Sequence, residues 1–328
     1  MKLSKSLTAA LIVGACVQLS PVSTAMAQEF PSKPVRITTP FPVGSGPEGV
    51  VRLLADSLSK TWGKPVIVEN KPGANGFIAI DQAKRQVADG HELLQMDTSQ
   101  LTTYQTLFKK LPYDPVKDFE PIIPLFRNYF MVAVGKDSPY KTVRDIVVDA
   151  KAKDGKVTYG SWSIGNPVHI ASEMIEAATG TKMTHVPYKE TSQLYIGVAN
   201  RELDWALGSV ATSGSLERAG KIRYIAVTAP KRLPDYPNLP TVAESGGPTD
   251  FDYSAWTALV APKGTPPAIV EKIHRDVAAA LAEPAMRAKF AALAYENYPL
   301  TRSGFNEVLT KERERNGAIV RRLNVQLD

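Results

Sequence analysis

The chain has 328 residues with 39 Lys or Arg, 33 Asp or Glu and a formal net charge of +6. A hydrophobic content of 44% and a charged content of 22% exclude a disordered, coiled-coil or collagen-like chain, and the length suits two domains. The basic residues are scattered rather than gathered into the stripe that a phosphate backbone requires, so the composition argues against a nucleic-acid partner.

Residues 1–27 predict a cleavable signal peptide. Lys2 and Lys5 precede an apolar run from residue 7 to 19, and Ala25-Met26-Ala27 is a small-x-small cleavage site. Cleavage as a lipoprotein at Cys16 is the alternative, and it would leave half of the apolar run on the mature protein. Cleavage after Ala27 removes Cys16, the only cysteine. We therefore expect a periplasmic protein without disulfides or thiolate chemistry.

Short β-rich runs alternate with segments of helical periodicity, which predicts an α/β fold with mostly parallel strands. In the first part we expect strands at 35–39, 65–69 and 92–95, helices at 50–62 and 78–88, and a proline-rich connection at 111–124. After it we expect strands at 129–135, 157–159, 184–188, 203–207, 222–229 and 253–261. The accompanying helices are expected at 142–153, 168–179, 193–200, 266–281, 284–294 and 302–323.

The first candidate site is the loop Gly44-Ser45-Gly46-Pro47-Glu48-Gly49, which precedes a predicted helix. With Glu69 twenty residues later it formally matches a dinucleotide-binding fingerprint, so an exported oxidoreductase is an alternative function. Residues 40–43 separate this loop from its strand, and Pro47 removes an N–H group. A glycine-rich loop at a helix N-terminus also binds anions through free N–H groups and the helix dipole.

A similar loop occupies residues 160–167, where Asn166 is a candidate N-cap and Pro167 the first helical residue. We expect the two loops to face each other across a cleft. The candidate ligand-binding residues are Val43, Gly44, Ser45, Gly46, Pro47 and Glu48 in the first loop, and Ser161, Trp162, Ser163, Ile164, Gly165 and Asn166 in the second.

Two of these candidates have alternative roles. An aromatic ring inside a Gly/Ser loop favours a ligand-facing role for Trp162, and packing on its own lobe is the alternative. Glu48 either faces the cleft or caps its own helix. The spacing of residues 160–165 is one residue too long for a nucleophile elbow, and the four histidines supply no third ligand beside His169 and Glu173. We expect no catalytic residue, metal or cofactor.

Seven ordered motifs resemble one family, the Bug-type extracytoplasmic receptors of tripartite tricarboxylate transporters, over essentially all of the mature chain. They are residues 30–37 (Phe-Pro-Ser-Lys-Pro-Val-Arg-Ile), 40–42 (Pro-Phe-Pro), 68–74 (Val-Glu-Asn-Lys-Pro-Gly-Ala), 110–119 (Lys-Leu-Pro-Tyr-Asp-Pro-Val-Lys-Asp-Phe), 185–189 (His-Val-Pro-Tyr-Lys), 239–244 (Leu-Pro-Thr-Val-Ala-Glu) and 261–267 (Ala-Pro-Lys-Gly-Thr-Pro-Pro).

The resemblance implies a non-enzymatic, two-lobed type II periplasmic binding protein, also called a Venus flytrap. We expect lobe 1 at residues 28–127 and 255–328, lobe 2 at 128–254, and a hinge near 126–129 and 251–256. It also implies a ligand clamped between the two loops and delivered to membrane transporter subunits by a monomeric receptor. The family's pattern adds Tyr188, Thr191 and Gly208 to the candidate ligand-binding residues.

Departures from the family's usual motifs bear on the ligand. The family's usual acid aligns with Gly208, and its absence argues against an amino-acid ligand. Two opposed helix N-termini suit a carboxylate at each end of the ligand. Trp162 favours an aromatic dicarboxylate such as terephthalate over malate, and an aliphatic acid such as citrate is the alternative.

Overall fold

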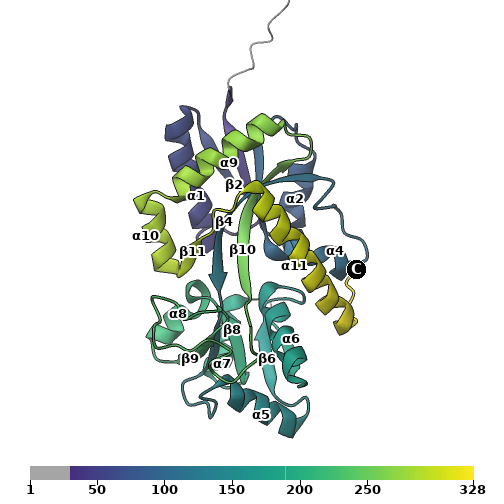
Figure 1. Cartoon of the computed structure of the whole chain (residues 1–328), viewed down its shortest axis with the longest axis vertical. Helices are drawn as coiled ribbons and strands as arrows, with labels where there is room; N and C mark the ends of the chain where they lie inside the picture. Colours follow the sequence, from purple (N-terminus) through teal and green to yellow (C-terminus); the bar gives the residue numbers. More distant parts are fainter. Residues whose placement is uncertain (1–29, 189) are drawn as a thin grey trace, which may run out of the picture.

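The computed structural model describes residues 30–188 and 190–328, so the predicted signal peptide and Cys16 lie outside the described residues. Two α/β lobes lie end to end, each built around one sheet (Figure 1). Within the described ranges, no helix combines the length and apolar character needed to cross a membrane.

The first lobe contains a six-stranded sheet in the order β11-β4-β10-β3-β1-β2. Its strands are β1 (Val35–Thr39), β2 (Val66–Asn70), β3 (Glu92–Asp97), β4 (Phe119–Tyr129), β10 (Ser254–Pro262) and β11 (Tyr295–Asn297). Its helices are α1 (Gly46–Trp62), the 3-10 turn η1 (Ala74–Gly76), α2 (Phe77–Lys84), α3 (Thr98–Thr102), α4 (Tyr104–Leu107), α9 (Pro267–Leu281), α10 (Pro284–Leu293) and α11 (Arg302–Leu323).

The second lobe contains a five-stranded sheet in the order β7-β6-β8-β5-β9. Its strands are β5 (Met131–Gly135), β6 (Thr158–Ser161), β7 (Thr184–Pro187), β8 (Trp205–Gly208) and β9 (Ile222–Val227). Its helices are α5 (Val143–Lys153), α6 (Pro167–Thr179), α7 (Thr191–Ala199) and α8 (Val210–Arg218).

The apolar stripe of α1 shows how hydrophobic periodicity in the sequence fixes a helix against the sheet. Val50, Leu54 and Leu58 recur at helical spacing and are fully buried, in one core cluster with Ile37 of β1. Each such leucine stabilises the lobe by about 1.5–3 kcal/mol relative to an exposed one. Because this face is fixed against the sheet, the start of α1 is held at the end of β1 that faces the second lobe.

The chain crosses between the lobes at two places, where β4 leads into β5 and where the segment after β9 leads into β10. The first sheet includes residues up to Tyr129 and again from Ser254, and these two residues pair with each other. Phe130 lies between β4 and β5, and Tyr253 directly precedes β10.

Thr228 joins the two crossings. Its Oγ1 accepts a hydrogen bond from the Phe130 N–H at 2.9 Å and donates one to the Tyr253 carbonyl at 2.7 Å. Backbone hydrogen bonds also join Thr228 to Phe130 and to Tyr253. Because Thr228 is fully buried, one hydroxyl fixes both crossings to the second lobe.

Helix α11 contacts both lobes. It packs on α3, α4 and β4 of the first lobe and also on α6 of the second (Figure 1). Near its end, Arg322 Nη2 donates to the Glu173 carbonyl of α6 at 3.0 Å. Helix α11, which was expected within lobe 1, therefore packs on the second lobe as well.

Two features of the sheets differ from the sequence prediction. The sheets are mixed, because the crossing strands β4 and β10 run antiparallel to each other and β5 runs antiparallel to β8 and β9. The stretch at 111–124 is not all connection, since β4 begins at Phe119 and includes Pro121 and Pro124. β11 pairs only with the far end of β4, which leaves the prolines on an edge that tolerates a missing N–H group.

Candidate ligand-binding cleft

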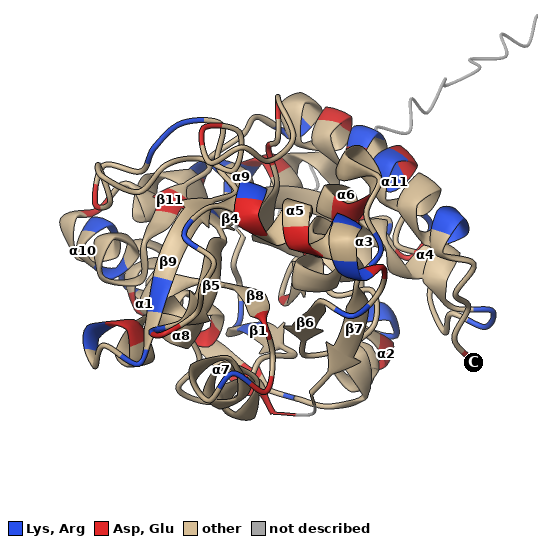
Figure 2. Cartoon of the chain, turned by 90° about the horizontal axis from the view of Figure 1, so that it is seen from below, with Lys and Arg blue, Asp and Glu red and all other residues tan. Residues whose placement is uncertain are grey.

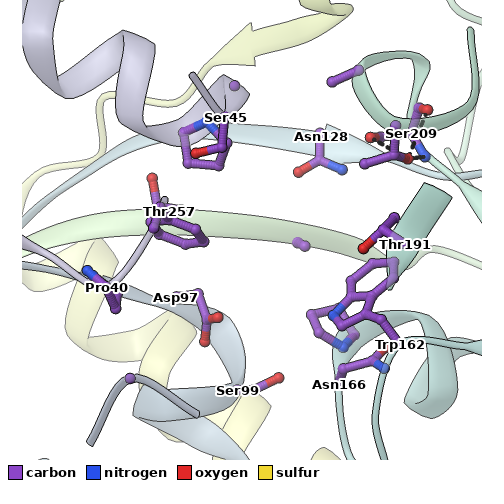
Figure 3. Close-up of a pocket in the computed structure, with 18 of the residues that line it drawn as sticks. Pro40, Ser45, Asp97, Ser99, Asn128, Trp162, Asn166, Thr191, Ser209 and Thr257 are labelled. Carbon is purple, nitrogen blue, oxygen red and sulfur yellow. Dashed lines mark hydrogen bonds between the residues drawn. The ribbon is translucent and has the colours of Figure 1, made fainter. Parts of the chain in front are cut away.

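A cavity of about 580 Å³ lies between the lobes and is bounded by both of them (Figure 3). First-lobe residues Pro40, Ser45, Asp97 and Thr257 lie on one side, and Trp162, Asn166, Thr191 and Ser209 lie on the other. The further lining residues are Phe41, Pro42, Gly44, Gly46, Pro47, Gly73, Asn75, Gly76, Ser99, Gln100, Tyr104, Phe126, Asn128, Phe130, Ser163, Pro167, Ala211, Thr212, Ala255, Trp256 and Tyr295. The described lining contains no Lys or Arg.

The first lobe presents the N-terminus of α1 to the cavity. Ser45 is the N-cap residue, its side chain makes no capping hydrogen bond, and Gly46 and Pro47 form the first turn. The Oγ of Ser45 is buried without a hydrogen-bond partner within the described part of the chain. An uncapped helix start and an unpartnered hydroxyl both favour an anion at this wall.

The second lobe brings the starts of three helices to the cavity, through Asn166 and Pro167 of α6, Thr191 of α7, and Ser209 and Thr212 of α8. The predicted cap of α6 is present, since Asn166 Oδ1 accepts from the N–H groups of Val168 at 2.8 Å and His169 at 3.0 Å. These N–H groups are therefore already used.

Residues of both predicted loops line the cavity, and α7 adds a further helix start to the second-lobe wall. The opposed, uncapped start in the second lobe belongs to α7, which begins at Thr191 without a side-chain cap, and not to α6. The N-terminus of α6 still contributes its dipole, but its first N–H groups are saturated by Asn166.

Trp162 lines the cavity and is also half-buried against the two core clusters of its lobe. Phe41, Tyr104 and Phe130 add aromatic surface elsewhere in the lining. The cavity therefore joins polar ends to apolar walls, which is the usual composition of a site for a small organic ligand.

Glu48 lies outside the cavity lining. Its carboxylate accepts from Arg52 Nε at 2.8 Å and from the Gly44 N–H at 3.2 Å, and the residue is buried. Burial alone would raise the pKa of Glu48, but these hydrogen bonds hold it below its usual range. Of the two alternatives, the structure places this carboxylate at its own helix start.

Six other candidate residues also lie outside the lining: Val43, Ser161, Ile164, Gly165, Tyr188 and Gly208. Val43 is 74% exposed and points away from the core. Ser161 is buried, and its Oγ bonds His185 Nε2 at 2.7 Å. Gly165 contacts the first lobe, with its carbonyl accepting from Ser99 Oγ at 3.2 Å.

Gly208 has no room for an acid. A Cβ atom there would lie 2.7 Å from Ser213 Oγ and 2.8 Å from the Tyr195 ring. These distances are too short for any side chain without a shift of the neighbouring groups. The cavity is instead reached by the next residue, Ser209.

The cavity contains one acid that the sequence analysis missed. Asp97 ends β3 and caps α3, with its Oδ1 accepting from the Gln100 N–H at 2.9 Å. Burial raises the pKa of Asp97 to about 6, although the hydrogen bonds from the Gln100 and Ser99 N–H groups act to lower it. The capping-box spacing of Asp97 and Gln100 was a readable signal for this helix start.

The dinucleotide alternative requires a free acid at Glu69. This carboxylate instead lies 3.1 Å from Lys71 Nζ and 3.6 Å from an Arg36 nitrogen, and accepts from Gln82 Nε2 at 3.0 Å. Its lone pairs are engaged on the surface of the first sheet, so the ribose contact of that fingerprint lacks its partner.

Acidic and basic residues are interspersed along the chain, as the colours show in the view from the second-lobe end (Figure 2). This distribution differs from the single-signed stripe of a nucleic-acid-binding surface.

A family model described as "Tripartite tricarboxylate transporter family receptor" matches residues 50–325. The chain belongs to this family. The resemblance to Bug-type receptors is confirmed, because relatives named BugT and BugD are also found. A curated relative from Cupriavidus necator, a UPF0065 protein in the gbd 5' region, is 32% identical over 92% of this chain and 90% of its own length.

Two solved structures of similar fold contain small acids. Rpa4515 of R. palustris with adipate has a TM-score of 0.79 and 28% identity, covering 89% of this chain and 98% of that one. MatC of Rhodopseudomonas palustris with bound malate has a TM-score of 0.76 and 26% identity, covering 89% of this chain and all of that one. The two-lobed periplasmic binding protein fold expected from the sequence is confirmed, and the family and these neighbours are solute receptors.

Proposed function

We propose that the protein captures a small dicarboxylate in the periplasm, after export with a cleaved signal peptide, and delivers it to the membrane subunits of a tripartite tricarboxylate-type transporter. An aromatic dicarboxylate such as terephthalate is favoured. The observation that carries this proposal is the pair of uncapped helix starts, α1 with Ser45 and α7 with Thr191, that meet one cavity from opposite lobes.

The chemistry of the lining supports two anionic ends joined by an apolar body. Without Lys or Arg in the described lining, carboxylates bind through backbone N–H groups, helix dipoles and hydroxyl groups. The indole of Trp162 offers a flat face to a ligand ring, which adds about 0.5–1.5 kcal/mol beyond the burial of area. The adipate and malate of the two neighbours are themselves dicarboxylates.

The receptor acts by closure of its lobes about the crossings at Phe130 and Tyr253. A ligand that bridges α1 and α7 contacts both lobes only when they are closed, so binding stabilises the closed state selectively. Release of an unchanged ligand is expected, because the protein acts as a monomeric receptor and not as an enzyme.

Isothermal titration calorimetry with terephthalate, adipate, benzoate and citrate tests the proposal. We expect terephthalate to bind most tightly and to be recovered unchanged, with a smaller radius of gyration of the complex by X-ray scattering. Trp162→Ala should weaken terephthalate about 2- to 10-fold more than adipate, whereas the control Trp162→Phe keeps a ring and most of the difference.

Other results would change the conclusion. Tight binding of citrate without the aromatic acid would favour the aliphatic alternative, and an altered ligand would favour an exported enzyme. Equal loss of terephthalate and adipate in Trp162→Ala would assign Trp162 to packing within its lobe.

A further inference from the structure

Asp97 is the acid among the described residues that line the cleft, and no cation is paired with it there. It lies on the first-lobe wall near Ser99 and Thr257, facing the cavity (Figure 3). Its carboxylate accepts hydrogen bonds from the N–H groups of Gln100 and Ser99, both neutral. No salt bridge joins Asp97 to a Lys, Arg or His in the described residues.

The elements packed around Asp97 present neutral or already paired groups. Tyr104, Tyr113 and Tyr253 face it as titratable neighbours, and the Asp97 charge raises the pKa of each of them beyond the rise that burial causes. Thr257 lies opposite Asp97 in the register of β10 and β3.

Helix α11, which packs on α3, carries three charged groups that are engaged elsewhere. Arg313 Nε donates to the Leu101 carbonyl at 2.9 Å, Arg315 lies over the Tyr253 ring at 5.1 Å, and Glu312 accepts from Trp256 Nε1 at 3.0 Å. These groups do not compensate the charge of Asp97.

A dicarboxylate in this cavity adds two negative charges beside Asp97, and the described lining residues include no cationic side chain. Carboxylates that share a poorly solvated site cannot all remain ionised, because like charges strongly raise the pKa of one member. The burial that already raises the pKa of Asp97 to about 6 acts in the same direction.

We propose that Asp97 enters the complex as a neutral acid, so that capture of a dicarboxylate takes up one proton, held between Asp97 and a ligand carboxylate. This inference rests on the proposed function. The proton comes from the solvent and no covalent bond forms. The neutral acid then donates a hydrogen bond to the ligand instead of repelling it.

The experiment measures proton uptake by titrating the mature protein with terephthalate and adipate in Tris, HEPES and TAPS buffers at pH 8. We expect each bound ligand to bring about one proton with it. Above neutral pH, the Kd should therefore increase by up to about tenfold for each pH unit. Asp97→Asn keeps an oxygen for the Gln100 N–H, so it should fold, take up no proton and bind with a Kd nearly independent of pH.

Glu176→Gln is the matched control, because burial and the charge of Glu173 also raise the pKa of Glu176, outside the cleft. This variant should keep the proton uptake. Binding without proton uptake in the unmodified protein, or an Asp97→Asn variant with unchanged uptake or lost affinity, would overturn the inference alone. If neither dicarboxylate binds between pH 5.5 and 8.5, the proposed function fails as well.

Discussion

The hydroxyl of Thr228 offers the most direct test of how the lobes are joined. Thr228→Val has nearly the same shape but removes the acceptor of the Phe130 N–H and the donor to the Tyr253 carbonyl. Thr228, Phe130 and Tyr253 are at most 2% exposed, so water does not replace these hydrogen bonds. Each buried group left unsatisfied costs about 1–3 kcal/mol, so we expect a loss of about 2–5 kcal/mol in unfolding free energy.

Urea denaturation followed by tryptophan fluorescence measures this loss, with Thr228→Ser as the matched control. Serine keeps the hydroxyl and loses one methyl group, for which we expect about 1 kcal/mol. If Thr228→Val were no less stable than Thr228→Ser, the hydroxyl would contribute nothing to the joint between the lobes, and this explanation of the hinge would be wrong.

Two further predictions concern the cleft. In the ligand-free protein, burial raises the pKa of Asp97 from 3.8 to about 6. The native state therefore binds this proton more tightly than the unfolded state does. As a result, the contribution of Asp97 to stability falls as pH rises from about 4 to 6. Thermal melts should therefore show Asp97→Asn gaining about 2–3 kcal/mol relative to the unmodified protein between pH 4 and pH 7. Asn166→Ala removes the cap of Val168 and His169 and should cost about 1–2 kcal/mol in urea denaturation, whereas Asn166→Ser retains most of the stability.

Periodicity and capping signals predicted much of the fold. Helix α11 begins at Arg302 and ends at Leu323 as expected, and β1 spans Val35–Thr39. Helix α8 was missed because its buried face is formed by Ser213 and Gly214 rather than by an apolar stripe. Pro121 and Pro124 are admitted into β4 because β11, about 170 residues later, pairs only with residues 126–128 and leaves the edge open beside the prolines. Local sequence patterns do not contain this information.

The cleft was only partly predicted, because local sequence motifs identify some of its residues and the arrangement of the strands determines others. Ser45, Trp162 and Asn166 stand in loops whose composition signals a helix start, and all three line the cavity. Asp97 lines it because β3 lies beside the crossing strand β10 in the centre of the first sheet. The order of strands in the sheet places β3 beside β10, and this order cannot be read from a single acid after a short apolar run. The sequence therefore did not predict that Asp97 lines the cavity.

Under the proposed function, a cleft whose described lining has no cationic side chain couples recognition to closure. An arginine in one lobe would hold a carboxylate strongly even in the open state, because its charge acts without help from the other lobe. Helix starts and hydroxyl groups act over short distances, so the donors of α1 and α7 reach one ligand together only after closure. Under the proposed function, the ligand would then contribute most of its binding free energy to the closed form, as expected of a receptor that delivers only its loaded state. In the proposed complex, a neutral Asp97 would strengthen this coupling, because the proton taken up on closure offsets one of the two negative charges that the dicarboxylate adds.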